Sequence, residues 1–184
     1  MQQLQRNSAH LRSTQYESEM NIENVESIKK SGFCGFKKIS ELRLDFSSIP
    51  KTKGVYLVLR PKNSEVEFVE KGTGGFFRDI NPNVDVSELK KKWLEKANII
   101  YIDNAGDSES DATLYSQLKQ YISFGQGNKV GHWDGRYIWQ IKDIDDYIIC
   151  WKELPKDWPT GVKLNLMELF WQKYDSLPFA NLKK

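Results

Sequence analysis

The fold of this chain is set by two apolar runs, Gly54-Val55-Tyr56-Leu57-Val58-Leu59 and Ile99-Ile100-Tyr101-Ile102-Asp103. Both runs are short, rich in β-branched residues and bounded by polar or glycine-containing stretches, as buried strands are. Each run carries one tyrosine. We therefore predict two buried strands, at 54–60 and 98–103, that deliver Tyr56 and Tyr101 to the same region of the fold.

Further strands and helices are predicted around these two. Charges that alternate with Val66 and Phe68 indicate an edge strand that forms a hairpin with the first one. Apolar residues at helical spacing predict helices, the first of them capped by Ser87. The predicted strands are 65–70, 137–141 and 147–151, and the predicted helices are about 87–96, 113–122 and 161–174. Residues 177–181 are expected to pack back as an extended tail.

The order of these elements, β-β-α-β-α-β-β-α, predicts an α+β fold with a small mixed, mainly antiparallel sheet flanked by helices. The chain has 184 residues, enough for one domain with a real core. Residues 1–30 are polar at first and without periodicity, so we expect a flexible N-terminal arm followed by a single domain at 31–184.

Composition bounds the function. Hydrophobic residues make up 39% and charged residues 28% of the chain. No apolar run approaches the roughly 20 residues of a membrane helix, and the first residues lack the apolar core of a secretory signal, so a cytoplasmic location is expected. The net charge is +2, so a surface for nucleic acid would have to be a local basic patch.

The small numbers of cysteines and histidines exclude a metal site built from these residues. Cys34 and Cys150 lack metal-ligand spacing and are expected to be buried reduced thiols. Two histidines, His10 and His132, are too few for a histidine-rich site. Any metal would be a hard cation held by oxygen ligands.

One acid stands in an otherwise apolar run of the last predicted helix. Glu168 lies within Leu164-Asn165-Leu166-Met167-Glu168-Leu169-Phe170-Trp171. A helix that is apolar on two sides is expected to be buried, and a buried acid needs a cation or a hydrogen-bond partner. That partner is either a metal ion or Arg136, and in the second case the pair is structural.

These blocks resemble a known family, the GIY-YIG nucleases. The first signature triplet is similar to Gly54-Val55-Tyr56 and the second to Tyr101-Ile102-Asp103; the family's acid and late asparagine correspond to Glu168 and Asn181. More narrowly, the chain resembles a bacterial branch of the family at two blocks, Gly131-His132-Trp133-Asp134-Gly135-Arg136 and Pro178-Phe179-Ala180-Asn181. The resemblance covers residues 32–181.

The resemblance implies a one-metal phosphodiesterase site. Glu168 would hold one Mg²⁺ or Mn²⁺, which polarises the attacking water and neutralises the phosphate. Tyr56 would act as general base, which requires a lowered pKa. Tyr101 and Tyr121 would position the water or a phosphate oxygen, and Asn181 would orient the acid or the water.

Two positions depart from the family pattern. The catalytic arginine of the family falls on Gln117, which donates hydrogen bonds but carries no charge, and the glycine of the second triplet falls on Asp103. Losing such an electrostatic donor costs about 10²–10³ in rate. Arg136, in the neighbouring loop, is the candidate to replace it.

Three functions from different classes follow. The first is a divalent-metal endonuclease that hydrolyses DNA, impaired by Gln117. The second is a catalytically inactive GIY-YIG-like module that binds nucleic acid or a protein partner, and such a partner could also supply specificity to an enzyme. The third is a structural module in which the tyrosines are ordinary core residues. For Trp133, packing in a tight turn and a substrate contact are equally good interpretations.

Overall fold

The computed structural model describes residues 20–62, 64–154 and 158–183. It divides into two compact units, and the boundary along the chain falls between Phe33 and Cys34. The described part of the first unit contains helix α2 (Val25–Lys30), capped by the Asn24 side chain, which accepts a hydrogen bond from the Ser27 amide. Most of the predicted N-terminal arm, residues 1–19, lies outside the described residues. All candidate site residues belong to the second unit.

The second unit is built on one antiparallel sheet. Its strands are β1 (Cys34–Lys38), β2 (Gly54–Leu59), β3 (Ile99–Ala105) and β4 (Ile148–Glu153), in the order β1-β4-β2-β3. Every neighbouring pair is antiparallel, and β2 is buried along its whole length. An α+β fold with an antiparallel sheet is thereby confirmed, and the strands predicted at 54–60, 98–103 and 147–151 are β2, β3 and β4.

Two predicted strands are wrong and one real strand was missed. Phe68 makes only an isolated bridge to Ile141, so 65–70 is not a strand of the sheet. The run predicted as strand 137–141 is mostly a 3₁₀ helix, η2 (Arg136–Gln140), which follows a left-handed turn at Gly135. Its side chains are buried, and a short apolar run buried on all sides carries no periodicity that separates strand from helix. The strand that was missed, β1, lies at one edge of the sheet; it is mostly polar and has no alternation to reveal it.

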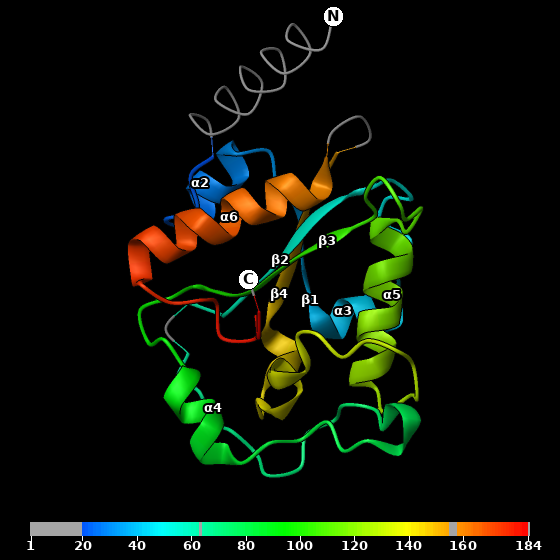
Figure 1. Ribbon diagram of the computed structural model, residues 1–184, viewed down its shortest axis with the longest axis vertical. Helices are drawn as coiled ribbons and strands as arrows, with labels where there is room; N and C mark the ends of the chain where they lie inside the picture. The colour runs from blue at the N-terminus through cyan, green and yellow to red at the C-terminus, as the bar shows by residue number, and fades with distance from the viewer. Residues whose placement is uncertain (1–19, 63, 155–157, 184) are drawn as a thin grey trace, which may run out of the picture. The chain divides into compact units, whose positions relative to one another are not determined.

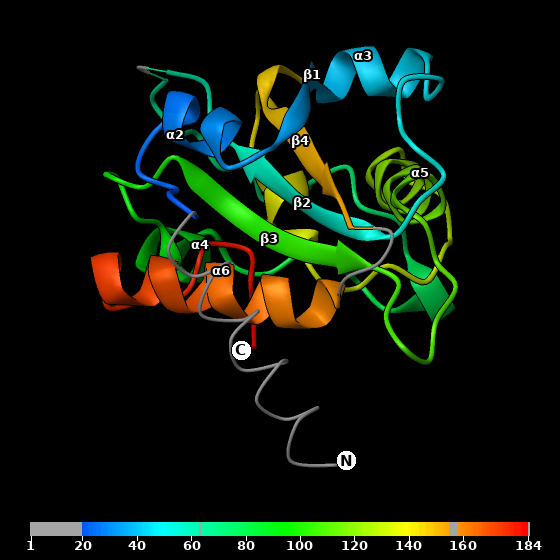
Figure 2. The same ribbon diagram turned by 90° about the horizontal axis from the view of Figure 1, so that it is seen from above.

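Helices enclose the sheet: α3 (Ile39–Leu44), α4 (Val86–Lys92), α5 (Leu114–Gly125) and α6 (Pro159–Tyr174), with short 3₁₀ turns η1 (Phe77–Asp79) and η3 (Ile144–Asp146). Figures 1 and 2 show that α6 runs alongside β3 and that α5 lies near the C-terminal end of that strand. The cap of α4 is Asp85 rather than Ser87, and α4 ends at Lys92, because Trp93 is already extended. None of the helices in the described part of the chain is long and apolar enough to cross a membrane.

The register of β2 against β3 determines where the two tyrosines lie. Tyr56 stands directly opposite Asp103, and Tyr101 is two residues before Asp103 on the same strand. Residues two apart on a strand point to the same face, so all three side chains share one face of the sheet. The core cluster on this face includes both tyrosines and also Leu118 and Tyr121 from α5.

The C-terminal tail covers the free edge of β3. The Ala180 amide donates to the Ile100 carbonyl at 2.8 Å. The Asn181 side chain accepts from the Ile102 amide at 2.9 Å and donates to the Ile102 carbonyl at 2.8 Å. An exposed strand edge invites pairing with other chains, so this tail satisfies backbone groups that would otherwise be open. The predicted packing of residues 177–181 against the domain is confirmed.

Candidate functional site

Three tyrosines from three elements meet beneath the surface. Tyr56 comes from β2, Tyr101 from β3 and Tyr121 from α5, and each is at most 1% exposed. The ring centroids of Tyr56 and Tyr101 are 6.1 Å apart, and that of Tyr121 lies 6.2 Å from the first and 5.5 Å from the second. We call these residues the tyrosine cluster. The predicted convergence of the two strand tyrosines is present, and Tyr121 joins them.

Asp103 lies at the centre of the polar contacts of this cluster. The hydroxyls of Tyr56 and Tyr101 both donate to its Oδ2, at 3.1 and 3.0 Å. Its Oδ1 accepts from Nζ of Lys163 on α6 at 2.6 Å. Both carboxylate oxygens are therefore bonded, and Asp103 is only 7% exposed. We call Asp103, Lys163 and the two phenols the Asp103 network.

The electrostatics of the cluster hold the phenols in the protonated state. Burial raises the pKa of Tyr56, of Tyr101 and of Tyr121 well above 10, and the negative charge of Asp103 raises each of them further. A general base at neutral pH needs the opposite shift, toward a lower pKa. In this arrangement Tyr56 is a hydrogen-bond donor to Asp103 and not a proton acceptor.

The loop 131–136 closes the cluster on the side of Tyr121. The Tyr121 hydroxyl donates to the Gly135 carbonyl at 2.9 Å. A Cβ atom at Gly135 would lie 2.7 Å from the Tyr101 ring and from the Tyr121 hydroxyl, and the residue has a φ of +75°. Only glycine fits there, because it has no side chain and tolerates the left-handed conformation. The backbone therefore lies directly on the phenols.

His132 belongs to the same loop and is buried against the cluster. Its ring centroid is 4.5 Å from that of Tyr121, and the residue is 5% exposed. Burial lowers the pKa of His132 to about 4, although the acids Asp103 and Asp134 act in the opposite direction. The imidazole is therefore neutral at physiological pH and packs as part of the core.

Glu168 is exposed, so its predicted burial is wrong. Its partner is Gln172, one turn further along α6, whose amide donates at 3.4 Å. The buried residues in the middle of α6 are Leu166, Met167 and Phe170, and Leu164 is 48% exposed, so the apolar run does not place every member inside. The α6 residue that reaches Asp103 is Lys163, about one and a half turns before Glu168.

This arrangement does not fit the metal site that the resemblance implies. Asp103 is the carboxylate beside the tyrosines, and Lys163 and the two phenols already occupy its oxygens. Glu168 contacts Gln172 rather than any of these groups, and among the described ranges no three histidine, cysteine, aspartate or glutamate side chains come together in a way that could hold a metal ion. A Mg²⁺ or Mn²⁺ ion in the cluster would have to displace the lysine.

The remaining predicted residues have separate positions. Gln117 is half-buried on α5, one turn before Tyr121, and supplies no charge. Asn181 is buried and uses both ends of its amide on the backbone of Ile102, so it holds the tail on β3 rather than an acid. Arg136 is half-buried, and it forms no ion pair with Glu168. Its guanidinium instead lies over the rings of Trp133 and Tyr137.

Sequence reasoning missed Lys163 and the role of Asp103. For Asp103 a signal was present, because an acid replaces the expected glycine of the second triplet. For Lys163 the sequence offers no comparable signal, since a lysine near the start of a helix is normally solvated. The two residues are 60 positions apart, and only the packing of α6 against β3 brings them together.

Of the two thiols predicted to be buried and reduced, Cys150 is buried and Cys34 is exposed, and both are free.

Comparison of the chain with family models, with curated proteins and with solved structures gave no match. The GIY-YIG resemblance therefore rests on the sequence blocks alone.

Proposed function

We propose that this chain is a catalytically inactive GIY-YIG-like module that binds nucleic acid. The observation that carries the proposal is the ion pair between Asp103 and Lys163 inside the tyrosine cluster. The nuclease chemistry implied by the resemblance needs a divalent cation at this place, held by an acid and facing the two strand tyrosines. Here an ammonium group provides the positive charge and leaves no free carboxylate oxygen.

Three further features agree with a loss of hydrolysis. The phenols are protonated, with pKa values raised by burial. Gln117 stands where the family has its arginine, so no fixed charge faces a developing negative charge from α5. Gly135 places loop backbone against Tyr101 and Tyr121, which excludes a substrate phosphate from the same space.

Nucleic-acid binding is supported by cations outside the cluster. Helix α4 ends in Lys90, Lys91 and Lys92, and Lys92 Nζ lies over the ring of Tyr137 at 5.9 Å from its centroid. Arg136 lies over the same ring at 4.9 Å. Since the chain is nearly neutral overall, a local group of cations is the form that a phosphate-binding surface has to take.

The test is to measure binding and cleavage on the same preparation. We expect a fluorescently labelled oligonucleotide to bind with an affinity that falls as salt rises. We expect supercoiled plasmid to stay intact with Mg²⁺ or Mn²⁺, even at micromolar protein. Nicking by the wild type that is lost in Tyr56→Phe would refute the proposal, and so would the absence of binding to both single-stranded and duplex DNA.

The Glu168→Ala variant serves as a control for these assays. Because Glu168 is exposed and apart from the cluster, the variant should bind as the wild type does. Nicking that is equal in wild type, Glu168→Ala and Tyr56→Phe would identify a contaminating nuclease.

A further inference from the structure

Arg136 carries an unusual deficit of hydrogen bonds. Its Nε and Nη1 atoms are buried and have no hydrogen-bond partner among the described residues. Buried charged donors are normally satisfied, and leaving one unpaired costs more than leaving a neutral group unpaired. The third nitrogen, Nη2, is not among these buried unpaired atoms. Two of the guanidinium's donors therefore lack an acceptor among the described residues.

Two aromatic rings fix the orientation of this guanidinium. Its Cζ lies 4.4 Å from the ring centroid of Trp133 and 4.9 Å from that of Tyr137. Stacking of this kind stabilises the cation and restricts the side chain. The backbone also contributes, since the left-handed turn at Gly135 immediately precedes Arg136 at the start of η2. A donor fork held in place before its ligand arrives loses little entropy on binding.

The surroundings of Arg136 are mixed in charge but leave it without an ion pair. Glu88 and Asp134 are close enough to interact electrostatically, yet among the described residues neither forms a salt bridge with it. Glu88 accepts a hydrogen bond from the Tyr137 hydroxyl instead. Burial outweighs both acids and lowers the pKa of Arg136, so the charge is desolvated and incompletely compensated.

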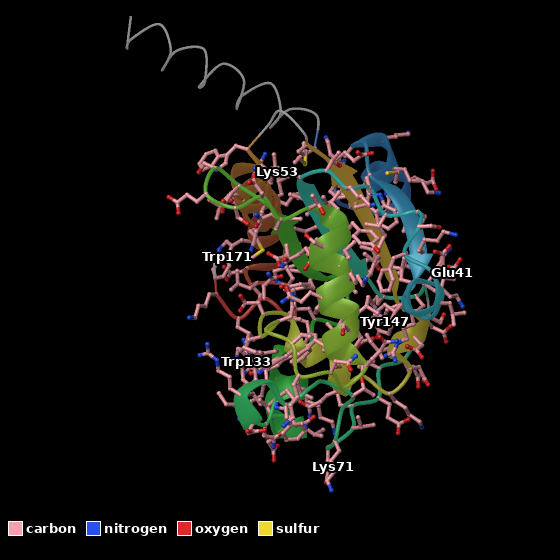
Figure 3. The ribbon with its side chains drawn as sticks, turned by 90° about the vertical axis from the view of Figure 1, so that its right-hand side faces the viewer. Glu41, Lys53, Lys71, Trp133, Tyr147 and Trp171 are labelled. Carbon is pink, nitrogen blue, oxygen red and sulfur yellow. The ribbon has the colours of Figure 1, made fainter. Side chains whose placement is uncertain are left out.

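Two neighbours of Tyr137, Lys92 and Phe179, also line a pocket. It has a volume of about 220 Å³ and is lined by Lys92, Trp171, Ser176 and Phe179, among others. The Phe179 ring lies 6.1 Å from the Tyr137 ring, and Lys92 extends over the same tyrosine. Figure 3 shows Trp133 and Trp171 on the same side of the structure.

We propose that Arg136 and Lys92 form a phosphate-binding site for the backbone of a nucleic acid, with Trp133 beside it as a surface for a base. This assignment rests on the proposed function and specifies its contact. The guanidinium fork matches the oxygens of a phosphate in a bidentate manner, whereas Lys92 contributes a point charge. Nucleic acid is favoured over a phosphorylated protein because the Trp133 ring and the Lys92 ammonium group both lie near the guanidinium, one able to stack on a base and the other to contact a phosphate.

The test compares Arg136→Gln and Arg136→Lys with a matched control, Arg78→Gln. Arg78 also lies over one aromatic ring, that of Phe77, at 5.2 Å, but it is exposed, so its loss removes the same charge from a different environment. The readout is fluorescence anisotropy with a labelled single-stranded 12-mer deoxyoligonucleotide and its duplex, at several salt concentrations.

We expect Arg136→Gln to weaken binding about tenfold or more and to reduce the slope of log affinity against log salt by about one. Arg136→Lys, which keeps the charge and loses the fork, should weaken binding severalfold. Arg78→Gln should stay within about twofold of the wild type. The melting temperature of unliganded Arg136→Gln should change little, because the loss of the two ring contacts is offset by removal of a desolvated charge that has no internal hydrogen bonds.

Each other outcome has a definite meaning. If the wild type binds DNA and both glutamine variants bind equally well, the site assignment is overturned while the proposed function stands. If the wild type binds neither oligonucleotide, both are overturned. If inorganic pyrophosphate or a phosphoserine peptide binds through Arg136 more tightly than the 12-mer, the phosphate site is real but its assignment to nucleic acid is overturned.

Discussion

Asp103 and Arg136 are both charged groups withdrawn from water, and the protein treats them in opposite ways. Asp103 receives two phenol hydroxyls and an ammonium group, so its charge is fully compensated inside the fold. Arg136 is held by two rings but has two buried nitrogens without partners. A compensated buried charge contributes to a specific packing arrangement, whereas an uncompensated one is suited to bind an outside partner.

The largest expected effect concerns the closure of the tyrosine cluster. Gly135→Ala should destabilise the fold by about 3 kcal/mol, because the new Cβ would lie 2.7 Å from two tyrosines and the backbone is left-handed. Chemical denaturation followed by circular dichroism measures the change.

Gly127→Ala is the matched control for Gly135→Ala. Gly127 has a φ of +87°, yet a Cβ there would have only the Thr73 carbonyl near it, at 3.8 Å. Its substitution should cost about 1 kcal/mol from backbone strain alone. Equal losses in the two variants would show that the loop does not press on the tyrosines and that the cluster is more open than described.

Removing Lys163 should expose how much the Asp103 network depends on compensation. Lys163→Met should cost about 2 kcal/mol, less than the 3–5 kcal/mol typical of a broken buried pair, because the lysine side chain is 26% exposed. In an Asp103→Asn background the same change should cost little, since the carboxylate charge is already gone. The coupling is read from denaturation of the four proteins in the cycle. Additive losses would contradict an energetic pairing of the two residues.

The buried histidine, His132, makes the stability of the fold sensitive to acid. The pKa of His132 is about 4 in the folded protein, against about 6.5 in an unfolded chain. Only the unfolded state gains a proton in this window, so stability falls as pH drops from about 6.5 to 4. The loss from this group reaches about 2 kcal/mol at pH 5.

Proton NMR of the His132 imidazole and unfolding at pH 7 and 5 measure this effect, and the acid loss should shrink in His132→Asn. Titration of His132 near pH 6.5 in the native protein would show that the imidazole is solvated, which contradicts its place beneath the loop.

The smallest effect is expected at Glu168. Glu168→Ala should change stability by no more than about 0.5 kcal/mol, because the carboxylate is exposed and its contact with Gln172 is long. A thermal melt of the two proteins is sufficient. A large loss of stability would show that Glu168 is buried in the domain as Asp103 is, and would restore Glu168 as a candidate metal ligand.

The sequence revealed those parts of the fold that have strong local signals. β2 and β3 are apolar β-branched runs, and α5 starts at Leu114, after Thr113, whose side chain caps the helix by accepting from the Ser116 amide. The strand β1 and the 3₁₀ helix η2 were not found. In both, packing against the rest of the domain overrides a local preference that is weak in β1 and points to a strand in η2.

The candidate site was predictable only in part for the same physical reason. Tyr56 and Tyr101 share a face because each lies on a strand with a clear signal. The placement of α6 on the sheet is a long-range property, so the sequence pattern suggested Glu168 as the inward residue whereas Lys163 is the one that reaches Asp103. Helical periodicity defines an apolar face but not which polar residue at its border turns inward.

Lys163 takes the place that a metal ion would need beside Asp103 and the phenols. Titration of Mn²⁺ into the wild-type protein, with the ring resonances of Tyr56 and Tyr101 followed by NMR, tests this replacement, because a paramagnetic ion broadens nearby signals. No selective broadening of these two rings at millimolar Mn²⁺ is the predicted result. Selective broadening of both rings, reversed by Mg²⁺, would contradict the claim and support a metal-dependent nuclease instead.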